Sequence, residues 1–235
     1  MIIAGFSEAK VSGQKDICLQ CMDFTFNDYL NECDSNALKE LLILNKSNVR
    51  SLLLENNSLE VSKILAVLQQ SKHSLERLKT IVAPELFKAL NNLNIQELHF
   101  IGQIDESSMS DALTSLPILT YLCIEDSILM EQTVLPGTIQ DIYLLKCTCK
   151  AFFLRRLLVY LSSLKHDVQL YLESVIVTDS HTPIFQSEIL LSDMTNINLC
   201  IEQGNNDLYD ILPCITIGKL SVHTAVDVSL ASKIV

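Results

Sequence analysis

Hydrophobic and polar residues alternate in short runs along the chain, and the clearest run lies at residues 49–59. It reads Val-Arg-Ser-Leu-Leu-Leu-Glu-Asn-Asn-Ser-Leu, which matches the pattern LxxLxLxxNxL if Val49 is allowed for the first leucine. Successive side chains of a β-strand point to opposite faces, so the fourth and sixth positions of this pattern share one face. The third, fifth and seventh positions share the other. We therefore expect a short strand with one buried and one open face.

The same pattern recurs along most of the chain. Further copies start at Leu19, Leu75, Ile95, Leu119, Ile139, Asp167, Met194 and Ile217, which makes nine units spaced by about 25 residues on average. The fourth and sixth positions of the nine units are apolar in all cases but one: Met22, Leu52, Leu78, Leu98, Leu122, Ile142, Leu170, Ile197 and Leu220, then Phe24, Leu54, Thr80, Phe100, Ile124, Leu144, Leu172, Leu199 and Val222. One unit cannot bury its own apolar edge, so the units are expected to stack into one continuous core.

The segments between the expected strands differ in length and character. Apolar residues at helical spacing predict helices at 37–45, 59–70, 84–92, 107–116, 151–164 and 207–212. The short unit that ends in Leu135-Pro136-Gly137-Thr138 has room for only an extended return.

On these repeats, the chain resembles the leucine-rich repeat superfamily. The resemblance implies an α/β solenoid with a parallel, concave β-sheet of about nine strands and a convex side that mixes helical and extended segments. It also implies one domain over residues 1–235, with repeats at 19–227 between an N-terminal cap at 1–18 and a C-terminal cap at 228–235. The LPxxIxxIxL string at 135–144 is similar to repeats of bacterial effectors, whereas the longer units are similar to animal NLR receptors and ribonuclease-inhibitor-like proteins. No subfamily is assigned.

Charge and composition exclude several functional classes. The chain has 28 acidic and 17 basic residues, a formal charge of −11, and no basic stripe, which disfavours nucleic-acid binding. Its six glycines form neither a G-x-G nor a G-x-x-x-x-G-K spacing, so neither nucleotide-binding fingerprint is present. The longest uncharged run, 112–124, is much shorter than the ~20 apolar residues of a membrane span, and we expect no membrane insertion.

The eight cysteines are expected to be reduced thiols. The chain as given shows no secretory signal, which favours a cytoplasmic, reducing location. Cys18-x-x-Cys21 with Cys33, and Cys147-x-Cys149, lack a nearby histidine or second C-x-x-C pair to complete a zinc site. We expect neither a bound metal nor a cofactor.

The third, fifth and seventh positions of the units define the expected concave face. Aromatic, apolar and charged side chains gather there over units three to seven, a mixture typical of binding hot spots, although β-propensity alone also places tyrosines on strands. The candidate partner-binding residues are Tyr121, Tyr143, Tyr171, Leu145, Ile101, Arg77, Lys79, His99, Glu125, Asp141 and Glu173.

His99 and Cys123 occupy the same position of adjacent units, where a thiolate and its base could lie side by side. Strand amides are already used in the sheet and cannot form an oxyanion hole, so catalysis is disfavoured. We expect non-catalytic recognition of a protein partner through the concave face. The alternatives are a ligand-sensing or autoinhibitory segment of a larger innate-immune-type receptor, a pathogen effector and, more remotely, a cysteine-dependent enzyme. Partner identity and oligomeric state stay open.

Overall fold

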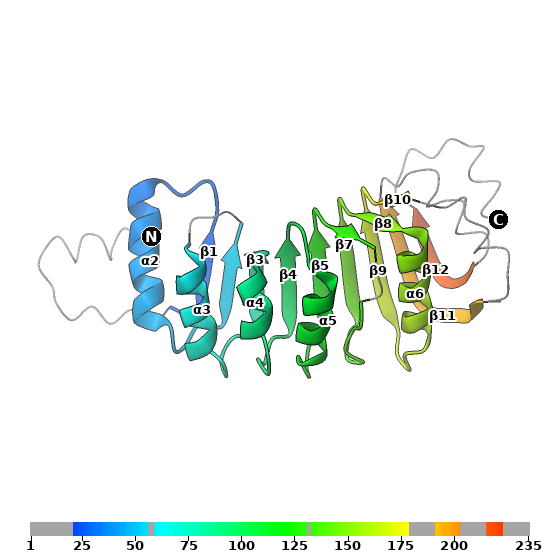
Figure 1. The fold of residues 1–235 in the computed structure, drawn as a ribbon, viewed down its shortest axis with the longest axis horizontal. Helices are drawn as coiled ribbons and strands as arrows, with labels where there is room; N and C mark the ends of the chain where they lie inside the picture. Colours follow the sequence, from blue (N-terminus) through cyan, green and yellow to red (C-terminus); the bar gives the residue numbers. More distant parts are fainter. Residues whose placement is uncertain (1–20, 56–58, 131–132, 179–190, 203–214, 223–235) are drawn as a thin grey trace, which may run out of the picture.

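The computed structural model describes residues 21–55, 59–130, 133–178, 191–202 and 215–222. They form an α/β structure built on a nine-stranded parallel sheet, in which the strands lie side by side in chain order (Figure 1). The strands are β1 (Asp23–Phe26), β2 (Ser51–Leu54), β3 (Arg77–Ile81), β4 (Glu97–Ile101), β5 (Tyr121–Glu125), β7 (Asp141–Leu145), β9 (Val168–Glu173), β11 (Leu191–Glu202) and β12 (Ile215–Val222). The parallel sheet that the resemblance implied is therefore present.

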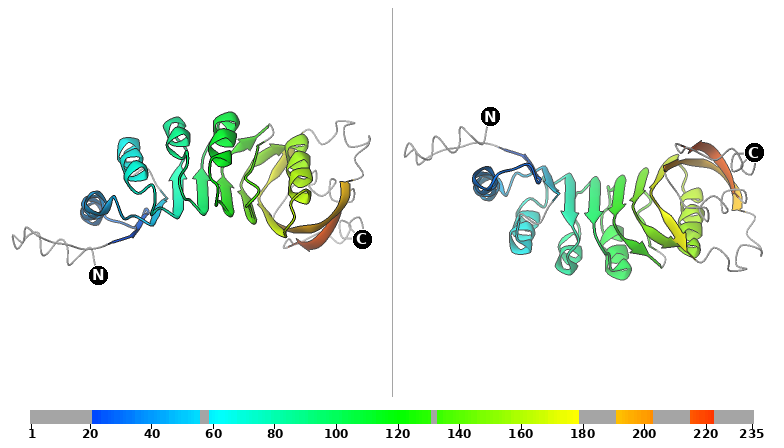
Figure 2. Two further views of the ribbon diagram at one scale, coloured as in Figure 1. Left: turned by 90° about the horizontal axis from the view of Figure 1, so that it is seen from below. Right: turned by 90° about the horizontal axis from the view of Figure 1, so that it is seen from above.

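Five helices cover one face of this sheet, while the opposite face carries none of the described helices (Figure 2). They are α2 (Glu32–Asn45), α3 (Val61–Gln70), α4 (Pro84–Ala89), α5 (Glu106–Thr114) and α6 (Ala151–Ser162), each overlapping a predicted helix. Two begin at a side-chain cap, because Asn31 accepts from the Asp34 amide at 2.9 Å and Asp105 accepts from the Ser108 amide at 3.1 Å. The helix predicted at 207–212 lies outside the described residues.

The return from β5 to β7 is extended, as its short length predicted. It contains β6 (Ile128–Leu129), which joins β8 (Thr148–Lys150) and β10 (Ile176–Thr178) in a three-stranded parallel sheet that the sequence pattern had not indicated.

The same turn recurs where successive strands end. Gly102, Asp126, Lys146 and Ser174 all occupy the eighth position of their units and adopt a positive φ, of 103°, 56°, 52° and 53°. In each case the backbone N–H donates to the last carbonyl of the next strand, at Glu125, Leu145, Glu173 and Glu202, over 2.7–3.0 Å. A positive φ is unfavourable for the three non-glycine residues, and the hydrogen bond to the next strand holds each of them in this conformation.

The core lies between the sheet and the helices. Leu52, Leu78, Leu98, Leu122, Ile142 and Leu170 form a cross-strand row of fourth-position side chains. All are at most 1% exposed and belong to one continuous cluster, as the stacked-unit prediction required. Thr80, the single polar residue in the two predicted columns, is buried as well.

The predicted register is wrong for the first and eighth units. Phe24 pairs with Leu52, where the pattern had placed Met22, and Met22 is 49% exposed. Likewise Leu199, not Ile197, pairs with Leu170. Both strands are displaced by two residues, which keeps each strand residue on its predicted face but leaves Met22 exposed, before the start of β1.

The predicted caps at 1–18 and 228–235 lie outside the described residues. Within the described part of the chain, no helix combines the length and the apolar character that crossing a membrane requires.

Candidate functional site

We call the sheet surface opposite α2–α6 the open face (Figure 2). It carries the third, fifth and seventh positions of the units. All of the predicted partner-binding residues lie on it, and all are partly or fully exposed: Arg77 and Lys79 on β3, His99 and Ile101 on β4, Tyr121 and Glu125 on β5, Asp141, Tyr143 and Leu145 on β7, and Tyr171 and Glu173 on β9.

Three tyrosines form a stack across the open face. Tyr143 and Tyr171 are cross-strand partners whose rings lie nearly parallel, with a 4° angle and 4.2 Å between ring centroids. Tyr121 lies against the other side of Tyr143 at 5.0 Å and 34°. Burial raises the pKa of Tyr143 to about 12 and also raises the pKa of Tyr121, so both hydroxyls are protonated donors at neutral pH. The stack presents a broad amphipathic surface.

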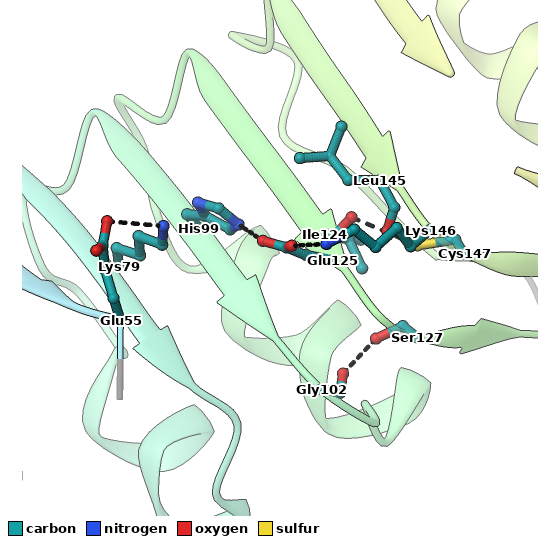
Figure 3. Close-up of polar contacts among 10 residues, drawn as sticks. All are labelled: Glu55, Lys79, His99, Gly102, Ile124, Glu125, Ser127, Leu145, Lys146 and Cys147. Atoms are coloured by element: carbon teal, nitrogen blue, oxygen red, sulfur yellow. Dashed lines mark hydrogen bonds and ion pairs between the residues drawn. The ribbon is translucent and has the colours of Figure 1, made fainter. Parts of the chain in front are cut away.

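Beside the stack, ion pairs connect neighbouring strands (Figure 3). Glu55 pairs with Lys79 at 3.3 Å. Glu125 accepts from Lys146 at 2.9 Å and lies 3.2 Å from His99 Nε2. Burial alone would raise the pKa of Glu125, but Lys146 and His99 outweigh it and leave the pKa below its ordinary value. Burial, reinforced by Lys79, holds the pKa of His99 below 6.5 despite Glu125.

Charge is unevenly distributed along the open face. Its basic side chains on the N-terminal strands are paired, and Asp23 contacts both Arg50 at 2.8 Å and Arg77 at 3.3 Å. Among the described side chains of β4, β5, β7, β9 and the C-terminal end of β11, acidic residues predominate on this face. Asp141, Glu173 and Glu202 have no salt-bridge partner among the described residues, and burial raises the pKa of Asp141.

Glu202 was missed as a candidate because of the register error in the eighth unit. The observed pairing moves it to the seventh position, directly beside Glu173. The ion-pair partners Arg50 and Lys146 were also missed, since they lie just outside the strand positions that the pattern assigns to this face.

His99 and Cys123 are adjacent, as predicted from their columns. The surroundings of the pair do not activate the thiol. Cys123 is 1% exposed, and burial raises its pKa to about 12, so it is protonated at neutral pH. His99 is engaged with Glu125 instead.

The other candidate thiols belong to the core. Burial raises the pKa of Cys147 to about 11 and of Cys149 to about 12, and the Cys147 thiol donates to the Ile124 and Leu145 carbonyls over 3.4 Å (Figure 3). Among the described residues, no three His, Cys, Asp or Glu side chains are grouped as a metal site would require. Cys18 lies outside them.

Two surface hollows are lined by described residues. One of about 160 Å³ lies on the open face, where Arg77, His99 and Tyr121 contribute to its lining. A larger one of about 440 Å³ lies on the helix side, lined by Leu65, Lys72 and Lys88 among others, and it contains no aromatic side chain. The open-face hollow adjoins the tyrosine stack and extends the same surface toward β3.

We compared the chain with protein-family models, curated proteins and solved structures, and none of the three comparisons found a match.

Proposed function

We propose that this chain is a solenoid of the leucine-rich repeat type that recognises a protein partner, without catalysis, through its open face. Three features support the repeat architecture: strands in chain order, a single continuous core, and a turn that recurs with the same hydrogen bond at successive strand ends. The unpaired, buried thiols of Cys123 and Cys147 support placing this function in a reducing, cytoplasmic compartment.

The tyrosine stack is the observation that carries the binding role. Rigid aromatic rings lose little conformational freedom on binding and are enriched where interfaces derive most of their energy. Tyr121, Tyr143 and Tyr171 lie together on the central strands of the open face, which none of the described helices covers, and carboxylates lie around them. A monomer gains little from keeping such a surface in water, whereas a partner that covers it buries the rings. The Tyr171 hydroxyl already donates to Gln169 Oε1 at 2.8 Å, which holds its ring in place.

The test begins with capture of partners from cell lysate on the immobilised chain, followed by affinity measurement with each purified partner. Tyr171→Ala should lower the affinity for the relevant partner by at least about tenfold, as removal of a central interface tyrosine does. Tyr29→Ala is the matched control, because Tyr29 is 94% exposed and lies outside the stack.

Stability is measured in parallel so that binding losses are not misread. Tyr143→Ala removes two ring contacts, each worth about 0.5–1.5 kcal/mol, whereas Tyr171→Ala removes one. The binding conclusion therefore rests on Tyr171→Ala at a temperature where both proteins are folded. The proposal is wrong if every captured partner binds Tyr171→Ala as tightly as it binds Tyr29→Ala.

A further inference from the structure

Among the described residues, no aromatic ring stacks on the second face of Tyr171, where the tyrosine stack ends. Tyr143 covers the face of Tyr171 directed toward β7. Strands β7 and β11 lie on opposite sides of β9, so the second face of Tyr171 is directed toward β11. There its cross-strand partner is Cys200, a small and half-buried side chain.

The spacing of neighbouring strands suits one planar group stacked on Tyr171 and lying over Cys200. Adjacent strands are about 4.8 Å apart, close to the separation at which flat groups stack. Tyr143 and Tyr171 use this spacing on the preceding pair of strands, with ring centroids 4.2 Å apart. A flat side chain of a partner can therefore continue the stack by one layer.

Two carboxylates border this position. Glu173 and Glu202 are cross-strand partners two residues beyond Tyr171 and Cys200, on the same face, and both are exposed. In the described part of the chain neither has a salt-bridge partner, and Lys146, whose charge interacts with Glu173, forms its ion pair with Glu125. The charge of Glu202 reaches the Cys200 thiol, whose pKa is raised first by burial and then by this carboxylate.

We propose that this end of the stack binds an arginine side chain of the protein partner, with the guanidinium stacked on Tyr171 above Cys200 and donating to Glu173 and Glu202. The inference rests on the proposed function and specifies the partner's chemistry. Arginine is planar, permanently charged and able to donate to two carboxylates at once, whereas lysine offers a strongly hydrated point charge. An apolar side chain would cover the carboxylates without replacing the hydrogen bonds that water makes to them, and a phosphate would be repelled by their charge.

The probe is a short Gly/Ser peptide that carries two arginines, titrated into the chain by calorimetry. Two further peptides carry lysine or citrulline at the same positions. Citrulline keeps the planar end group of arginine but has no charge, whereas lysine keeps the charge but has no planar group. We expect the arginine peptide to bind about tenfold more tightly than either.

Three variants locate the site. Tyr171→Leu removes the ring but keeps apolar volume, Glu202→Gln removes one carboxylate, and Cys200→Phe fills the stacking space. Each should weaken the arginine peptide by about tenfold. Glu97→Gln is the matched control, because it makes the same charge change on the open face at β4, three strands away from β9, and should change affinity by less than about twofold.

Equal affinity for the arginine and lysine peptides, absence of binding by all three, or an unchanged affinity in Tyr171→Leu would each overturn the inference. If that happens while a captured partner still loses affinity in Tyr171→Ala, the proposed function stands and only the arginine assignment fails. Sedimentation of the chain alone tests a different occupant: a dimer that Tyr171→Leu converts to monomer would show that a second copy covers this face, which also overturns the inference.

Discussion

Truncation of Leu122 tests whether the stacked units share one tightly packed core. Leu122 lies at the centre of the sheet on β5, is 1% exposed, and has Leu98 and Ile142 as cross-strand partners. Leu122→Ala removes its branched end from between these two residues and leaves a cavity. The in-register strands on either side are held by the sheet and cannot move independently to fill it.

The expected loss is therefore in the upper half of the range for buried leucines, about 3.5–5 kcal/mol. That is a large part of the roughly 5–15 kcal/mol by which a folded domain is stable. Urea unfolding followed by circular dichroism measures it. With a slope of about 3 kcal/mol per molar urea, the midpoint should fall by at least about 1 M.

Leu145→Ala is the matched control, because it makes the same truncation on the open face of the neighbouring strand β7, where Leu145 is half-buried. It should cost about 1 kcal/mol. If Leu122→Ala lowers the midpoint no more than Leu145→Ala does, the continuous core is not packed as described and the repeat interpretation loses its physical basis.

Three further predictions concern other parts of the molecule. A thiol reagent should modify exposed Cys33 rapidly and buried Cys123 and Cys147 only upon unfolding, and the denatured, unreduced protein should show eight free thiols. Rapid modification of Cys123 in the folded protein would instead favour the cysteine-dependent enzyme. Burial holds the pKa of His99 below 6.5, so the unfolded state takes up this proton at a higher pH than the folded state does, and the free energy of unfolding should fall as the pH drops below about 6.5. Urea titrations at several pH values should show a weaker dependence of this free energy on pH in His99→Gln, and an unchanged dependence would contradict the prediction. Asp105→Ala should cost about 1 kcal/mol by removing the N-cap of α5, and a loss below the error of urea unfolding would show that the cap is dispensable.

The central strands could be predicted from sequence because their buried leucines alternate with polar residues between clear boundaries. The errors at β1 and β11 have a common cause. Apolar residues continue at two-residue intervals through Phe24 and Phe26, and through Ile197, Leu199 and Ile201. A two-residue displacement keeps every side chain on its face, so alternation alone cannot choose between the registers.

The sequence pattern could not predict features that depend on how far a side chain extends or on very short segments. Strands β6, β8 and β10 contain only two or three residues, too few to show a period. Ser127 departs from the asparagine expected at the ninth position, yet its hydroxyl donates to the Gly102 carbonyl (Figure 3). Its hydrogen bond supports the turn of the preceding unit, which the residue type alone did not indicate.

The candidate surface was predictable in outline and not in detail. Tyr121, Tyr143 and Tyr171 occupy odd-numbered positions of their units, which places them on one face, and the cross-strand register places Tyr143 beside Tyr171. The stacking of all three rings, the ion pair between Glu125 and Lys146, and the contact between Glu125 and His99 depend on side-chain rotamers that a linear pattern does not specify.

Photocrosslinking from within the stack tests the central claim most directly. A photoreactive phenylalanine analogue replaces Tyr143 on the open face in one protein and Phe152, which is 39% exposed on α6, in another. Our account predicts that the captured partner forms a crosslink from position 143 and none from position 152. A crosslink from position 152 with none from position 143 would show that the helix side binds the partner and would contradict recognition through the open face.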